Sequence, residues 1–245
     1  MENNSVNHDS ITFTAIIFVV ENSIGNPVIK KGTYPKLDIL AKRGSCGFLS
    51  VFNNCPDVIT QLTGINHLGT DGFIREVGEI KLSVLKNSST FDQYGDIISV
   101  SSKNNDEIYS MINDLIKPSH IIIVELKSLE DANEIIGGFL PRIDSENIAI
   151  SLISGYREGS IIPTFPSPPV VDPSWRVIGA DVVEALSIKK PMVFITASKN
   201  LTRIDNVASF DEKDIEDNNC MNALPICQYF REFSYYSGSS WKYGA

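Results

Sequence analysis

Residues 34–47 read YPKLDILAKRGSCG, and apolar runs lie on both sides of this segment. FTAIIFVV (13–20) precedes it, and FLSVF (48–52) follows it. A continuous apolar run rich in β-branched residues is typical of a strand buried on both faces of a sheet. Pro35 suits the first turn of a helix, and Gly44 suits its end. Between them, apolar residues recur at helical spacing, at Leu37, Leu40 and Ala41.

The rest of the chain continues this alternation of strands and helices. Further strands are expected at residues 79–85, 96–102, 119–126, 146–154 and 191–198. Further helices are expected at residues 56–64, 105–116, 129–140, 181–186 and 222–236. Strands that alternate with helices predict a mostly parallel sheet covered on both faces. The predicted fold class is therefore α/β, with three layers in the order α/β/α.

Three segments are expected to lie outside these layers. The polar residues 1–10 are predicted to form a disordered tail, and the acidic residues 205–217 are predicted to be solvated. The proline-rich residues 161–175 predict a long irregular loop over the surface, and such loops often carry function. The PTFPSPP run within this loop has two readings, a stiff connection or a polyproline ligand for a partner domain. Residues 11–245 are expected to form a single domain.

Composition restricts the class of protein and of partner. The chain has 245 residues, a formal net charge of −9 and a hydrophobic content of 42%. The negative charge disfavours nucleic acid and anionic membranes as partners. No window approaches the roughly 18 apolar residues of a membrane span, and no signal peptide is recognisable. The cysteines are scattered, without a CxxC pair, so a cytoplasmic protein is expected.

Two stretches carry a resemblance to a known family. PKLDILAKRGSCGFLSV (35–51) is similar to a first motif that reads TPNLDALAxxGxxG, and CPDVITQLTGI (55–65) is similar to a second that reads GSDTAHLSLLG. Together with the preceding buried strand, they resemble the N-terminal half of a cofactor-independent phosphoglycerate mutase of the archaeal type, in the alkaline phosphatase superfamily. Residues 119–132 and the tail SWKYGA resemble the family more weakly. The resemblance implies an alkaline-phosphatase-like core, and the shorter chain suggests that the inserted substrate-covering cap domain is missing.

The resemblance also implies a two-metal phosphotransfer site. In such a site, two divalent ions about 4 Å apart activate a nucleophile and stabilise the transferred phosphoryl group. The first metal-ligand position falls on Glu21, where the family has aspartate. The nucleophile position falls on Cys55, with Asn54 and Asp57 as rival occupants. Cys55 is either a nucleophile activated at a helix N-terminus or a buried small thiol.

The other positions that the resemblance assigns to metal ligands carry unsuitable side chains. Leu129 stands where the family has aspartate, and residues 152–155 read LISG where it has Asp-His. The chain has three histidines, of which His8 lies in the tail and His120 begins a strand. Only His67 lies in a plausible loop. Glu130 and Asp131 cannot by themselves rebuild two metal shells.

These observations favour a phosphoglycerate-mutase-like pseudoenzyme, a binding or regulatory protein that needs no cofactor. One alternative is an active mutase or phosphatase with a divergent site, which would need a Mn or Zn pair. A second alternative is a structural subunit of a protein assembly. The expected partner is a protein or a small anionic ligand, and three basic residues near predicted strand ends could bind the anion, namely Lys127, Arg157 and Arg176.

Overall fold

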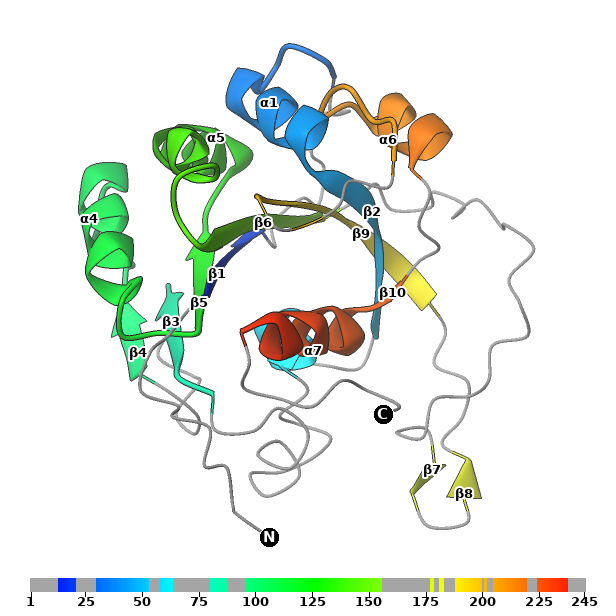
Figure 1. Ribbon diagram of the computed structural model, residues 1–245. Helices are drawn as coiled ribbons and strands as arrows, with labels where there is room; N and C mark the ends of the chain where they lie inside the picture. Colours follow the sequence, from blue (N-terminus) through cyan, green and yellow to red (C-terminus); the bar gives the residue numbers. More distant parts are fainter. Residues whose placement is uncertain are drawn as a thin grey trace, which may run out of the picture.

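Most of the predicted elements form one large sheet with helices on both of its faces. The computed structural model describes residues 13–20, 30–52, 58–63, 80–87, 96–155, 177–178, 181–182, 188–199, 201, 205–219 and 224–237. Within these residues the sheet has eight strands, in the order β10-β2-β9-β6-β1-β5-β3-β4 (Figure 1). The strands are β1 (Thr14–Val20), β2 (Ser45–Phe52), β3 (Leu82–Lys86), β4 (Asp96–Ser99), β5 (Ile121–Leu126), β6 (Ile148–Gly155), β9 (Ile188–Ser198) and β10 (Leu224–Pro225).

The helices form two layers. They are α1 (Pro35–Arg43), α2 (Val58–Thr63), α4 (Asn105–Leu115), α5 (Leu129–Phe139), α6 (Glu212–Asn218) and α7 (Ile226–Tyr236), with a short 3-10 helix at Leu140–Arg142. Figure 1 shows α1, α4, α5 and α6 around the outer side of the curved sheet, and α7 on its inner side. The predicted three-layer α/β/α fold is confirmed.

Strand β1 lies near the centre of the sheet and sets its direction. It pairs in parallel with β5 on one side and with β6 on the other. Strand β9 is antiparallel to both of its neighbours, β2 and β6. Within the described residues, β9 is the one strand of the large sheet that runs against the others. The other strands therefore end at the same edge of the sheet.

Alternate residues of β1 supply two separate hydrophobic cores. Ile16, Phe18 and Val20 pack in the cluster that includes residues of α1, α4, α5 and α6. The intervening residues of β1, Ala15, Ile17 and Val19, pack in the cluster that includes residues of α2 and α7. This alternation follows from the two-residue period of a strand, and it explains why residues 15–20 of β1 are all apolar.

Helices α1 and α4 begin and end where their sequences predict. Pro35 is the first residue of α1, and Gly44 follows its last residue. Asn104 accepts a hydrogen bond from the backbone N–H of Glu107, whose carboxylate accepts one from the backbone N–H of Asn104. This reciprocal capping box satisfies two N–H groups at the start of α4.

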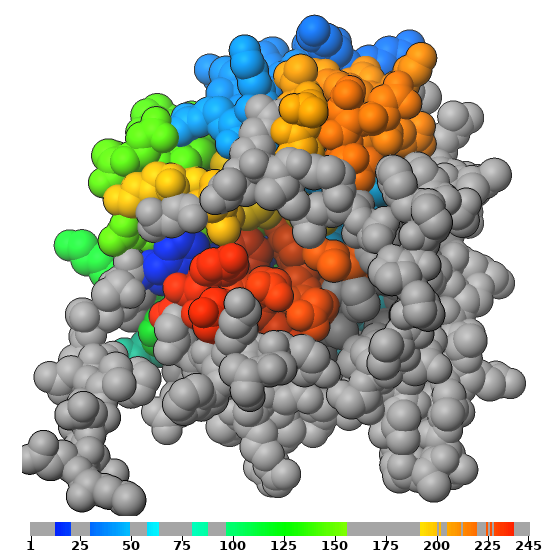
Figure 2. All heavy atoms as spheres, turned by 45° about the vertical axis from the view of Figure 1, so that its right-hand side comes forward, coloured from blue at the N-terminus to red at the C-terminus, as the bar shows by residue number. Residues whose placement is uncertain are grey.

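The core beneath α7 contains a buried polar cluster. The Tyr229 hydroxyl lies 2.5 Å from the Ser151 hydroxyl and also hydrogen bonds the Thr196 hydroxyl. Burial raises the pKa of Tyr229, although the hydrogen bonds from its neighbours act in the opposite direction. The phenol therefore stays protonated, and it links α7 to β6 and β9 through neutral hydrogen bonds. Figure 2 shows this side of the molecule, where part of α7 reaches the surface.

Two sequence predictions are wrong. The helix expected at residues 181–186 is contradicted, because Asp181–Val182 is strand β8, paired with strand β7 (Val177–Ile178). The β-branched residues Val177, Ile178 and Val182 favour this extended pairing. Residues 183–186, like the expected tail 1–10 and loop 161–175, lie outside the described residues.

The acidic segment 205–217 is not solvated along its whole length. Val207, Phe210 and Ile215 are buried in the core beneath α1. The carboxylate of Asp205 is itself buried and accepts hydrogen bonds from the backbone N–H groups of Cys46 and Val207. Asp211 and Asp214 also accept hydrogen bonds from backbone N–H groups, which the sequence does not reveal. None of the helices in the described part of the chain reaches the length and apolarity that a bilayer span requires.

Candidate functional site

The carboxyl edge of the sheet is the first place to look for a site. In open α/β sheets, ligands bind in the crevice beyond the carboxyl ends of the parallel strands. Val20, the last residue of β1, pairs with Leu126 of β5 and with Ser154 of β6. Glu21 and Lys127 are the residues that follow β1 and β5 in the chain. The register therefore places Val20, Leu126 and Ser154 together at one edge.

Of the predicted site residues, Lys127 lies in the described part of the chain. It is exposed, and its ammonium group donates a hydrogen bond of 3.1 Å to the backbone oxygen of Ser101. Cys55, Glu21, Arg157 and Arg176 lie outside the described residues, and so does His67. His120 precedes β5, at the opposite edge of the sheet, as predicted. Its ring nitrogen Nδ1 accepts a hydrogen bond from the backbone N–H of Lys81.

The strand ends expected to carry metal ligands are built from core residues. Leu129 is the first residue of α5 and is 4% exposed, packed in the core between the sheet and the outer helices. At the end of β6, Leu152, Ile153 and Ser154 are fully buried. An aliphatic side chain cannot ligate a divalent cation. The described residues at these two strand ends therefore do not fit the two-metal site that the resemblance implies.

The acids next to Leu129 make hydrogen bonds within the protein. The Glu130 carboxylate accepts a hydrogen bond of 3.0 Å from the Tyr34 hydroxyl. Hydrogen bonding to its own backbone and then to Tyr34 lowers the pKa of Glu130. Burial, and then Glu130, raise the pKa of Tyr34. The Asp131 carboxylate accepts hydrogen bonds from Ser128, the N-cap of α5, and from Asn105 of α4, so it links the two helices.

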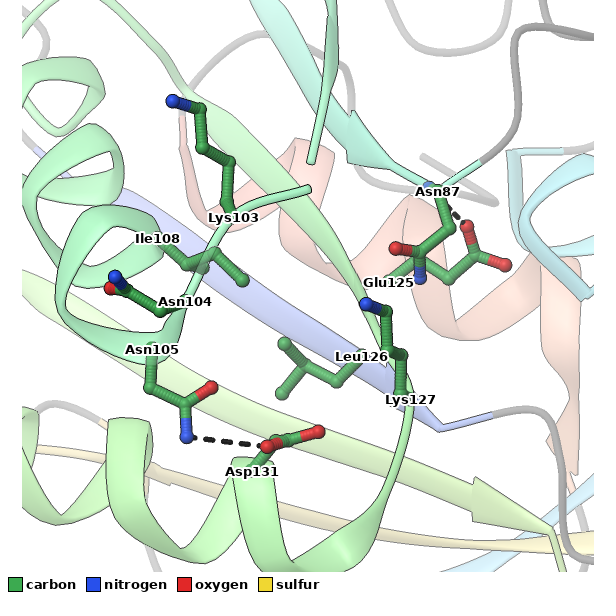
Figure 3. A pocket seen from close by; sticks show the side chains of 9 residues that line it. All are labelled: Asn87, Lys103, Asn104, Asn105, Ile108, Glu125, Leu126, Lys127 and Asp131. Atoms are coloured by element: carbon green, nitrogen blue, oxygen red, sulfur yellow. Dashed lines mark hydrogen bonds between the residues drawn. The ribbon is translucent and has the colours of Figure 1, made fainter. Parts of the chain in front are cut away.

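A polar pocket lies at the same edge, between β3, β5 and the start of α4. Its volume is about 230 Å³. Figure 3 shows Asn87 and Glu125 at one end, Asn105 and Asp131 at the other, and Lys127 between them. The side chains of Ile108 and Leu126 form an apolar wall of the pocket. The remaining lining residues are Lys103 and Asn104.

Comparison with known proteins identifies the fold. A structure of the PH0037 protein from Pyrococcus horikoshii is similar with a TM-score of 0.62, at 9% identity, over 96% of this chain and 99% of that one. A cofactor-independent phosphoglycerate mutase from Thermoplasma acidophilum is similar with a TM-score of 0.59, at 8% identity, over 92% of this chain and 100% of that one. The chain therefore shares the fold of these two proteins.

Sequence comparison adds no relationship to this structural one. No protein-family model matches the chain, and no curated protein matches it. The expected family is therefore supported at the level of fold, and its chemistry is not. Because the match spans all of the Thermoplasma chain, it gives no evidence for a missing cap domain.

Sequence reasoning missed most of the pocket. Asn87, Asn104 and Asn105 were not recognised as candidate residues, although the signal for two of them was present. Asn104 and Asn105 follow β4 and open α4, and residues between a strand end and a helix start often line a site in this fold class. No cluster of three or more His, Cys, Asp or Glu side chains that could hold a metal occurs among the described residues.

Proposed function

We propose that this chain is a phosphoglycerate-mutase-like protein without the two-metal phosphotransfer site, and that it binds a protein partner or a small ligand at the carboxyl edge of its sheet. The main support is the burial of Leu129 and of the end of β6 in the hydrophobic core. Restoring a metal ligand at either place would bury a charged or polar group among apolar side chains, which is costly unless the group is paired.

Metal titration together with activity assays tests this proposal. Isothermal titration of the full chain with Mn²⁺ and with Zn²⁺ is expected to show no tight stoichiometric binding. Mutase and nitrophenyl phosphatase assays with each metal are expected to show no turnover. The Thermoplasma acidophilum mutase is the positive control in the same buffers. Stoichiometric tight binding accompanied by turnover would refute the proposal.

Variants of the two cysteines in the N-terminal half would distinguish activity of this protein from activity of a contaminating enzyme. If activity is found, the variant Cys55→Ala should abolish it when Cys55 is the nucleophile. The matched variant is Cys46→Ala, because Cys46 is a fully buried thiol in the outer core. Loss of activity in the first variant and not in the second would establish an active enzyme with a divergent site.

A further inference from the structure

The charges inside the pocket at the carboxyl edge disfavour an anion. Lys103 points away from the other labelled side chains (Figure 3), and its ammonium group donates to the Glu107 carboxylate at 2.8 Å. Among the nine described residues that line the pocket, Lys127 is then the one cation that faces the two lining carboxylates, Glu125 and Asp131. A phosphate group would meet more negative than positive charge there.

The helix starts beside the pocket do not compensate for this charge. The capping box of Asn104 and Glu107 occupies N–H groups at the start of α4. The Ser128 side chain accepts the backbone N–H of Asp131 at the start of α5. Each helix also carries two acids in its first turn. These carboxylates already complement the positive end of each helix dipole, which is where a bound anion would otherwise be stabilised.

The groups that face the pocket include both hydrogen-bond donors and hydrogen-bond acceptors. Within the described residues, the Lys127 ammonium group donates to one acceptor, the backbone oxygen of Ser101, and an ammonium group can donate three hydrogen bonds. The Asn105 side-chain nitrogen donates to Asp131 and Glu134, so its oxygen remains as an acceptor. One Glu125 oxygen accepts the backbone N–H of Asn87 at 2.7 Å, and carboxylates have further acceptor sites.

A hydroxyl is a neutral group that matches all of these side chains. It accepts from an ammonium or an amide nitrogen and donates to a carboxylate or an amide oxygen. The carbon face of a polyol or sugar would lie against the apolar wall formed by Ile108 and Leu126. The pocket, at about 230 Å³, is smaller than the roughly 300–1,000 Å³ of drug-sized sites. It therefore suits a ligand no larger than a monosaccharide.

We propose that this pocket binds a small uncharged polyhydroxyl compound, a polyol or a monosaccharide. This names a ligand class for the binding role proposed above, and it does not depend on the loss of the metal site. A metal-binding result would leave it unchanged, and its failure would leave the metal prediction unchanged.

An NMR titration of the full chain tests the proposal. The probes are myo-inositol, D-glucose and glycerol, with inorganic phosphate and ethanolamine as the anionic and cationic comparisons. The backbone amides of Asn87, Asn105 and Lys127 are expected to shift saturably with at least one polyhydroxyl probe. The dissociation constant should be about 1–10 mM, the range for a ligand of this size. Saturable shifts with phosphate or ethanolamine alone, or no saturable shifts with any probe, would overturn the proposal.

Two variants test the direction in which the binding affinity should change. Lys127→Met keeps the aliphatic stem and is expected to weaken binding about fivefold, the loss of one hydrogen bond. The control is Lys117→Met, at an exposed lysine beyond the other end of α4. Glu125→Gln keeps the acceptor for the Asn87 N–H and removes the charge. It should weaken binding of a hydroxyl donor, whereas it would strengthen binding of an anion, and the latter result contradicts the proposal.

Discussion

At the scale of single residues, the carboxylate of Asp214 holds the backbone just before α6 in place. Asp214 accepts hydrogen bonds from the backbone N–H groups of Ala208 and Ser209, from the Ser209 hydroxyl at 2.7 Å, and from the Asn218 amide. Burial raises the pKa of Asp214, but these hydrogen bonds outweigh it, so the pKa is lowered overall. The ionised carboxylate is therefore more stable in the folded protein than in the unfolded chain.

Replacement of Asp214 should destabilise the protein in a pH-dependent way. We expect Asp214→Asn to lower the free energy of unfolding by about 1–3 kcal/mol at neutral pH, because charged hydrogen bonds are lost. Because the folded pKa is depressed, this contribution is present above the unfolded pKa of about 3.9 and is lost as the pH falls through the folded value. Urea unfolding of wild type and variant between neutral pH and pH 3 measures the difference.

The exposed Asp217 provides the matched control for this measurement. It lies on the same helix, α6. Asp217→Asn should change the free energy of unfolding by no more than about 0.5 kcal/mol, as surface substitutions usually do. A difference between Asp214→Asn and wild type that stays constant down to pH 3 would show that the carboxylate charge is not the cause.

At the scale of elements, the α1–β2 junction explains the most informative stretch of the sequence. Gly44 ends α1 in an extended conformation, with its backbone N–H bonded to the Leu40 oxygen. A Cβ at this position would overlap the backbone oxygen of Thr196 and lie 2.8 Å from its carbonyl carbon. The glycine is therefore required by the close approach of β9, and a positive φ is not the reason.

Adding a methyl group at Gly44 should be costly for this reason. We expect Gly44→Ala to lower the free energy of unfolding by about 1–3 kcal/mol, since the obstructing atoms belong to the backbone and cannot move freely. Gly137→Ala in α5 is the comparison, because its Cβ would meet the side chain of Lys36 at 3.0 Å. Lys36 is exposed and can shift, and alanine has a helix propensity better by about 1 kcal/mol. Equal losses in the two variants would contradict the backbone argument.

Elements with local signals were predictable, and long-range pairings were not. Proline, glycine and apolar spacing predicted α1 and β2 close to their observed bounds, and the helices α4 and α5 as well. The reversed direction of β9 depends on its pairing with β2 and β6, for which the sequence has no local signal. The candidate site shows the same limit. Lys127 could be placed at a strand end, but the contact between Asn105 and Asp131 depends on how α4 packs beside α5.

At the scale of the whole molecule, one sheet lies between two hydrophobic cores and contributes residues to both of them. Phe139 of α5 is fully buried on the outer side, where its ring centroid lies 4.5 Å from that of Tyr109. Phe230 of α7 is 1% exposed on the inner side. Because residues 15–20 of β1 alternate between the two cores, neither helix layer can leave without exposing a face of the same central strand.

We therefore predict that both layers unfold in one cooperative transition, as expected of a single domain. Phe139→Ala and Phe230→Ala should each lower the free energy of unfolding by about 3–5 kcal/mol, the usual cost of a large cavity. Hydrogen exchange measured by mass spectrometry should show that each variant weakens the protection of peptides from both α5 and α7. If Phe230→Ala weakens α7 alone while α5 keeps its wild-type protection, the inner layer opens independently. The expectation of one domain would then be wrong, and the carboxyl edge would be shared by two units that open separately.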